Sequence, residues 1–318
     1  MSPIAVSLFG QFRVSYQEQV IQELNKAKVQ ELFSYLLLHR QHPHHREALA
    51  TLLWEELPFE QSKRYLRKVL WQLQTPFSGL ISAEAPQILN VQGEWIQINA
   101  AADITLDVSQ LENAFARGQG KTGRQLSAAE AALLQTAASV YTADLLEGWF
   151  QDWCLYTRER LQQMHLLVLD KLIDYCLAHA QYDNGIAHCF RILQIDIAHE
   201  RTHRYLMQLY YLSGNRTQAL RQFDVCAATL ERELQVAPGR QTVALRDRIM
   251  SDKPISVLRD NGARNEALPT AVSLYPSTDP QMARMHAEIR QMESCLRRMQ
   301  FSFQTLLSAK DRAGRRFE

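Results

Sequence analysis

The stretch Phe59–Gln74, FEQSKRYLRKVLWQLQ, decides how the first third of this 318-residue chain is interpreted. Its apolar residues recur three and four positions apart, which predicts an amphipathic helix. The expected core face holds Leu66, Val69, Leu70 and Leu73. The opposite face is basic, and no acidic residue occurs between positions 61 and 74. Such a face neutralises phosphates and offers arginine to guanine edges, so it predicts DNA binding; the alternative is a basic surface that is merely solvated.

The segments around this helix complete a winged helix-turn-helix pattern. Apolar residues alternate over 4–8 and 12–16, which predicts a small antiparallel sheet. Helical spacing returns over 26–40 and again over 46–54, which places two helices before the basic one. Residues 88–98 predict a hairpin that turns near Gly93, in the place of a wing.

The expected DNA contacts are distributed over this module. On the basic helix they are Lys63, Arg64, Tyr65, Arg67, Lys68 and Trp71. Arg64, Arg67 and Lys68 are expected to meet phosphates or base edges, and the two aromatic residues to shape the surface. Lys26, Lys28 and Arg46 are candidates for contacts to the DNA backbone. Trp95 beside the hairpin turn is either a wedge toward the minor groove or an aromatic packed on the domain surface, and the second interpretation is favoured.

The middle of the chain, about 103–250, is predicted to be helical throughout. Gly214–Leu220 lies 34 residues after Ala180–Ile186, with small residues at the first position of each stretch and again five residues later. A period of 34 residues, with small residues at close helix contacts, is typical of tetratricopeptide (TPR) repeats.

The C-terminal part changes character near Ser251. Residues 251–281 are rich in Pro and Ser and predict a linker. From 282 to 306 apolar residues recur in alternating steps of three and four, which predicts a coiled-coil-like helix within a 282–310 segment. Two roles are open for this helix: pairing with a second copy, which is favoured and would make a homodimer, or packing on the protein's own TPR surface.

Composition limits the possible functions. The formal net charge is +1, and residues 1–100 hold nine Lys or Arg against nine Asp or Glu, so any DNA contact must rest on a local patch. No signal peptide or membrane span is expected, and the five cysteines lack the spacing of a zinc site or disulfide framework. These features predict a cytoplasmic protein.

Other motifs carry little chemistry. His39, His42, His44 and His45 form a cluster, but Pro43 disrupts helical pairing of ligands, so no metal is expected. Residues 118–123, GQGKTG, have the wrong glycine spacing for a phosphate loop, so they predict an exposed loop. No catalytic constellation is found, so neither an enzyme nor a cofactor is expected.

Several motifs, in one order, resemble the SARP-type antibiotic regulatory proteins. The N-terminal motifs are Leu8–Val14, Lys26–Lys28, Leu36–His39, Arg46–Leu49 with Leu53–Trp54, and Ser62–Leu70. Those further along, Tyr141–Gly148, Asp152–Trp153, His199–Met207 and Glu231–Pro238, resemble the bacterial transcriptional activator domain of that family. Tyr65 stands where the family usually has Asn, Gln74 where it has Arg, and Asp196-Ile197 where it has Asp-Pro.

The resemblance implies a fold and a function. The fold is mainly α: an OmpR-like winged helix-turn-helix with small antiparallel sheets over 1–100, an all-α TPR-like activator domain over 101–250, and the coiled-coil-like helix. The function is transcription activation, with binding to direct repeats in promoter DNA, contact to RNA polymerase and a place at the nucleoid. The alternative is a TPR-type adaptor whose winged module has lost specific DNA binding, as the balanced charge and the changes at Tyr65 and Gln74 would allow.

Overall fold

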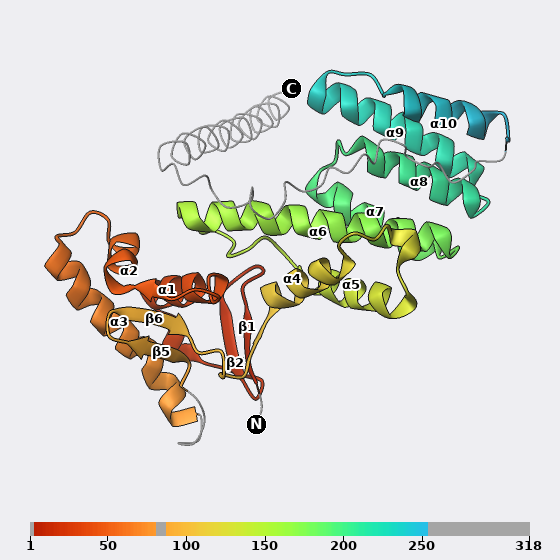
Figure 1. The fold of residues 1–318 in the computed structure, drawn as a ribbon. Helices are drawn as coiled ribbons and strands as arrows, with labels where there is room; N and C mark the ends of the chain where they lie inside the picture. Colours follow the sequence, from red (N-terminus) through yellow and green to blue (C-terminus); the bar gives the residue numbers. More distant parts are fainter. Residues whose placement is uncertain (1–2, 81–86, 254–318) are drawn as a thin grey trace, which may run out of the picture. The chain divides into compact units, whose positions relative to one another are not determined.

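The computed structural model describes residues 3–80 and 87–253, and an N-terminal sheet opens the chain (Figure 1). Its order is β3-β2-β1-β7. The strands are β1 (Ile4–Ser7), β2 (Arg13–Tyr16), β3 (Gln19–Val20) and β7 (Ile104–Leu106). Strands β1, β2 and β3 pair antiparallel, as expected, with Val6 opposite Val14. The prediction of a helical chain from 103 onward is wrong at its start. Residues 104–106 form β7, which pairs parallel to β1 with Ile4 opposite Ile104. A strand of three residues is too short to show a period in the sequence.

Three helices form the core of the first module: α1 (Ala27–Leu38), α2 (Arg46–Leu53) and α3 (Phe59–Leu80). The apolar face predicted for α3 is buried, with Leu66 and Leu73 at 1% and 0% exposure. The helix runs beyond the expected end at Gln74 although Pro76 lies inside it. Its last turns are stabilised by Phe77, which is buried and lies 6.0 Å from the ring of Phe33; this contact offsets the hydrogen bond that proline removes.

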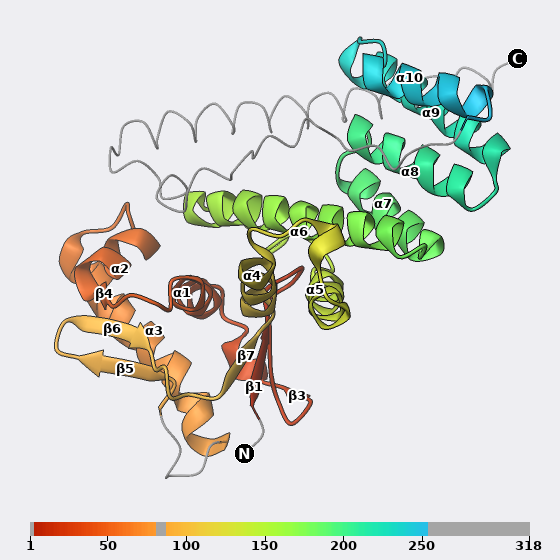
Figure 2. The same ribbon diagram turned by 45° about the vertical axis from the view of Figure 1, so that its right-hand side comes forward.

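A second sheet forms the wing, with strand order β4-β6-β5 (Figure 2). Strands β5 (Leu89–Gln92) and β6 (Trp95–Ile98) are the predicted hairpin, and Gly93 at its turn has a φ of +59°. Strand β4 (His44–His45) lies between α1 and α2, where the sequence pattern predicted no strand. It pairs with β6, with His44 opposite Ile96. A strand of two residues is too short to be recognised from the sequence, and its partner lies in a distant segment.

The rest of the described chain is helical. Helices α4 (Asp107–Gly118) and α5 (Ala128–Val140) pack against the long α6 (Asp152–Ala178) (Figure 1). They are followed by α7 (Tyr182–Ile195), α8 (Glu200–Leu212), α9 (Arg216–Leu234) and α10 (Arg240–Met250), each packed on its predecessor. Two short 3-10 helices, Gln22–Leu24 and Gly123–Gln125, lie in connections. The mainly helical fold with small N-terminal sheets is confirmed.

The 34-residue repeat corresponds to helix pairs α7–α8 and α9–α10. Ala180 and Gly214, which start the two matching stretches, both have a left-handed backbone, with φ of +54° and +85°. Each lies between two consecutive helices, where a left-handed residue reverses the chain. Gly185 and Ala219, five residues later, are both buried, and a Cβ at Gly185 would lie only 2.9 Å from Leu209 of α8. The small residues therefore permit close packing of helices, as their spacing predicted.

Two predictions concern residues that the structure does not describe in full. The coiled-coil-like helix at 282–306 lies outside the described residues, as does most of the 251–281 linker. Within the described part of the chain, no helix has an apolar stretch long enough to cross a membrane. The four cysteines described there are free and buried: Cys154, Cys176, Cys189 and Cys226.

Candidate nucleic-acid interface

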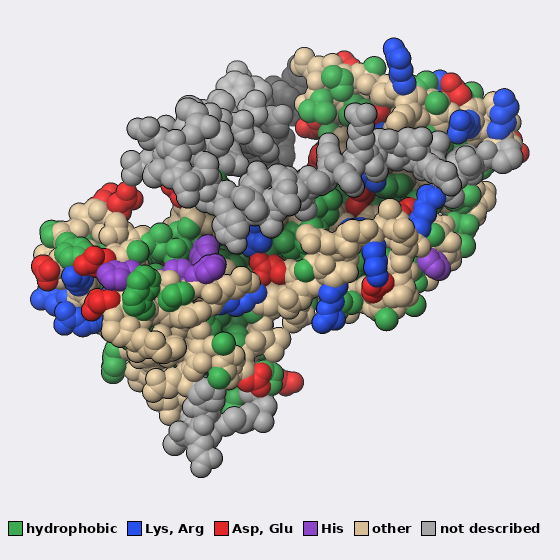
Figure 3. Space-filling model, in the orientation of Figure 1, with side chains coloured by type: hydrophobic (Ala, Val, Ile, Leu, Met, Phe, Trp, Pro, Cys, Tyr) green, Lys and Arg blue, Asp and Glu red, His purple; other side chains and the backbone are tan. Residues whose placement is uncertain are grey.

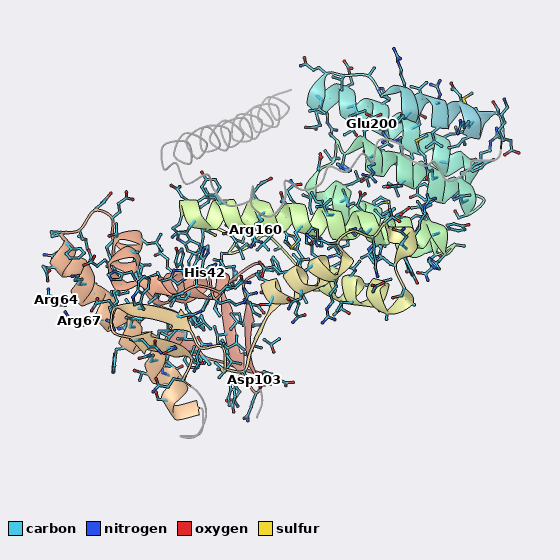
Figure 4. The ribbon with its side chains drawn as sticks, viewed as in Figure 1. His42, Arg64, Arg67, Asp103, Arg160 and Glu200 are labelled. Atoms are coloured by element: carbon cyan, nitrogen blue, oxygen red, sulfur yellow. The ribbon has the colours of Figure 1, made fainter. Side chains whose placement is uncertain are left out.

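The exposed face of α3 carries a stripe of cations. Arg64, Arg67 and Lys68 are exposed, and Trp71 continues the same stripe because it lies three residues after Lys68 and four after Arg67. Figure 3 shows Lys and Arg side chains gathered at the left of the molecule, where α3 lies. Figure 4 places Arg64 and Arg67 on the outer side of α3. We call these four residues the α3 stripe. The burial of Leu66, Val69 and Leu70 fixes the helix so that the stripe faces outward.

The three cations of the α3 stripe are available to a ligand. Among residues 3–80 and 87–253, none of them has an ion pair or side-chain hydrogen bond in the structure. The only acidic residue on α3, Glu60, lies in its first turn. A concentration of unneutralised positive charge on one helix face attracts the phosphate backbone, and arginine in addition can bind the O6 and N7 atoms of guanine.

Lys63, the fourth basic residue of α3, has partners within the protein. Its ammonium lies 3.2 Å from a carboxylate oxygen of Glu47 on α2 and 4.0 Å above the ring of Phe59. These contacts tie the start of α3 to α2, so part of the charge of Lys63 is already neutralised. The sequence showed the cation, but its acidic partner lies sixteen residues away and could not be identified there.

The aromatic residues of α3 differ in their surroundings. Tyr65 is 39% exposed and its ring lies 5.9 Å from that of Trp54, so the two rings cover the turn between α2 and α3. Trp71 is 65% exposed, the largest exposed fraction among the large apolar side chains described. Tyr65 therefore belongs to the domain surface, whereas Trp71 projects from it.

The wing is attached to α2 by Arg46. The Arg46 guanidinium donates a hydrogen bond to the Gly93 carbonyl at the hairpin turn (3.2 Å), and its backbone N–H donates to Glu94 (2.8 Å). Trp95 is 50% exposed, and its ring lies 5.2 Å from that of His45. Strands β5 and β6 and their turn contain no Lys or Arg, so the wing adds no positive charge to the interface.

The two lysines near α1 have different environments. Lys26 is exposed at the start of α1. The Lys28 ammonium instead donates hydrogen bonds to Glu31 (2.8 Å) and to the Leu53 carbonyl (2.7 Å). Lys28 thus connects α1 to the end of α2, and the structure does not bring it to the α3 stripe as a free cation.

The four clustered histidines are dispersed by the fold. His39 and His44 lie against Tyr35, at ring distances of 4.5 Å and 5.3 Å, whereas His42 is exposed and His45 contacts the wing. Burial lowers the pKa of His39 to about 4, with the charges of neighbouring groups as smaller causes. In the described ranges no group of three His, Cys, Asp or Glu side chains is arranged to hold a metal ion.

A charged bridge joins this module to the helical part of the chain. Glu112 of α4 lies 2.9 Å from Arg40, which follows α1, and 2.8 Å from Arg160 of α6. The Tyr35 ring lies 5.5 Å from that of Trp153 on α6. Nothing in the local sequence identified Glu112, because its two partners are 72 and 48 residues away.

Comparisons with known proteins agree with this organisation. Residues 106–250 match the family model of the bacterial transcriptional activator domain. Among solved structures, the fold is similar to that of Mycobacterium tuberculosis EmbR in complex with a low-affinity phosphopeptide, with a TM-score of 0.59 and 19% sequence identity. That similarity covers 80% of this chain and 67% of EmbR, and at this identity it concerns the fold alone. No curated protein sequence matches the chain.

Proposed function

We propose that this chain, a transcriptional regulator of the SARP type by its activator domain and its fold, binds promoter DNA through α3. The observation that carries the proposal is the α3 stripe, whose three cations lack partners within the described residues. A helix-turn-helix presents its second helix to the major groove, and α2 and α3 have that order, with the wing after them.

The residues divide by role. Arg64, Arg67 and Lys68 contact phosphates or base edges, because they are exposed and unpaired in the described chain. Lys63 adds a weaker contribution, since Glu47 shares its charge. Tyr65, Lys26, Arg46 and Trp95 form the surface around the α3 stripe and contribute secondary contacts to the DNA. Lys28 is omitted from the contact set because its ammonium is bound inside the module.

The helical domain supplies the second half of the function. We assign it contact to RNA polymerase, which the resemblance to the SARP-type regulators implies, and it has no catalytic role in this proposal. A homodimer formed through the 282–306 segment would place two α3 stripes on direct repeats, and effective concentration would then raise the overall affinity for the promoter above that of a single stripe. Such a protein acts in the cytoplasm, at the nucleoid.

The test uses the full chain and a duplex selected from a random library. Arg67→Ala and Lys68→Ala should each weaken binding and lower the slope of log K against log salt by about 0.9 per lost phosphate contact. Arg221→Ala is the matched control, because Arg221 is exposed on α9, away from α3 in the sequence and on another element.

Two outcomes would contradict the proposal. Unchanged affinity and salt slope in both variants would remove α3 as the recognition helix. A library from which the wild-type chain selects no motif would favour the adaptor alternative, in which the repeats bind another protein and the winged module does not bind a specific DNA sequence.

A further inference from the structure

Trp71 has an exposure that the packing of the protein does not explain. Its side chain is 65% exposed, and among the described residues its indole makes no ring contact or hydrogen bond in the structure. Its backbone carbonyl accepts from Thr75, so the helix around it is intact. A large apolar ring exposed at the end of a basic helix face is suited to a surface that becomes buried when a ligand binds.

The neighbours of Trp71 identify the kind of ligand. Lys68 lies three residues before it, Arg67 four and Arg64 seven, so all of them share its side of α3. Beyond Trp71 the exposed side chains of α3, Thr75 and Ser78, are uncharged, and their hydroxyls donate to carbonyls within the helix. The indole therefore lies at the end of the cationic stripe, where DNA bound by Arg64, Arg67 and Lys68 would lie close to it.

Base chemistry then limits what the ring recognises. In the major groove the apolar group that distinguishes one base from the others is the C5 methyl of thymine. An indole face buries such a methyl, while the polar edges of the other bases would lose water without gaining a partner. Resting on the proposed function, we infer that Trp71 is a specificity-determining residue that selects thymine through its methyl group.

The geometry of the helix predicts where this thymine lies. Four residues separate Arg67 from Trp71, which corresponds to about 6 Å along an α-helix. Since successive base pairs are about 3.4 Å apart on each strand, the thymine should lie about two base pairs from the base pair that faces Arg67.

The experiment uses the full chain, a motif selected from a random duplex library, and duplexes in which each thymine is replaced singly by deoxyuridine. Replacement removes only the methyl group. At one position it should weaken wild-type binding about four-fold, which corresponds to about 0.8 kcal/mol for one buried methyl. Trp71→Ala should bind the thymine and uracil duplexes equally, whereas Trp71→Phe should keep the preference. Phe190→Ala, a change of an exposed aromatic on α7, should leave the preference unaltered.

The outcomes separate this inference from the function on which it rests. If the wild-type chain selects a motif but no uracil replacement depends on residue 71, the thymine contact is wrong while DNA binding stands. If Trp71→Phe loses affinity without any thymine dependence, the indole N–H binds phosphate instead, and the inference is again overturned. If no motif is selected, the proposed function fails and the inference fails with it. Equal melting temperatures of the variants establish that the fold is intact.

Discussion

Replacement of Asp107 by alanine should destabilise the connection between the N-terminal sheet and the helical domain. Asp107 is the first residue of α4, directly after β7, and it is 8% exposed. One carboxylate oxygen accepts hydrogen bonds from the backbone N–H groups of Leu8 (2.7 Å) and Phe9 (2.9 Å), and the other from Val108 (2.7 Å). The same segment is bonded to the helical domain, since Gly10 donates to the Asp144 carbonyl over 2.8 Å.

The magnitude follows from the donors that alanine leaves behind. Leu8 and Phe9 are 0% and 4% exposed, so their N–H groups cannot easily turn to water. A buried donor without a partner costs about 1–3 kcal/mol, so Asp107→Ala should lower the free energy of unfolding by about 3 kcal/mol. Asp107→Asn keeps one acceptor oxygen for Leu8 and Phe9 and loses the bond to Val108, so it should cost only about 1 kcal/mol.

The pH dependence gives an independent check. Burial raises the pKa of Asp107, and the hydrogen bonds from the backbone only partly oppose it. A carboxyl group whose pKa is higher in the folded than in the unfolded state binds its proton more tightly when folded. Its contribution to stability is therefore greatest below the unfolded pKa and falls as the pH rises through the folded pKa. The difference in free energy of unfolding between wild type and Asp107→Asn should change between the unfolded and the folded pKa of Asp107, and it should be constant at higher pH.

Urea unfolding, followed by circular dichroism, measures these differences by linear extrapolation. Equal m-values would show that the variants unfold the same structure. If Asp107→Ala and Asp107→Asn differed by less than about 0.5 kcal/mol, the role of the carboxylate as acceptor for the buried N–H groups of Leu8 and Phe9 would be refuted.

Three further predictions follow from other contacts. Burial lowers the pKa of His165 to about 3, so the stability that its neutral form contributes is complete above pH 6.5 and is lost below it. The free energy of unfolding should therefore be about 2 kcal/mol lower at pH 5 than above pH 6.5. His165→Gln should flatten the dependence of the urea midpoint on pH. Gly123→Ala would place a Cβ 2.1 Å from the Lys171 carbonyl oxygen, so it should lower the free energy of unfolding by about 3 kcal/mol in urea titrations; an unaltered midpoint would contradict this packing. Glu47→Gln should free the Lys63 ammonium and steepen the salt dependence of DNA binding by up to about one phosphate contact, with Lys63→Ala cancelling the gain.

The activator domain expected from the sequence motifs is confirmed by the family-model match over residues 106–250, and the expected fold by the similarity to EmbR. It could be recognised from sequence because several short motifs occur in one order. EmbR is only 19% identical to this chain, so the two share a similar fold with few identical residues.

Elements with a strong period were predictable. Leu66, Leu70 and Leu73 recur at helical spacing, and all three are buried on α3. The hairpin turn at Gly93 has the left-handed backbone that its glycine permits. Elements without a period were not predictable. Strands β4 and β7 have two and three residues, and each forms by pairing with a strand that is distant in the sequence.

The sequence by itself determined which residues of α3 turn inward, because the helical period and the hydrophobic effect depend on local spacing. Only the tertiary structure decided which cations of this module remain without a partner inside the protein. Lys28, Arg46 and Lys63 are as basic as their neighbours, but the fold brings a carbonyl or a carboxylate to each of them. The partners come from segments 16 to 47 residues away, and folding alone fixes the distances on which hydrogen bonds and ion pairs depend. Arg64, Arg67 and Lys68 receive no such partner within the described residues, and this difference defines the proposed interface.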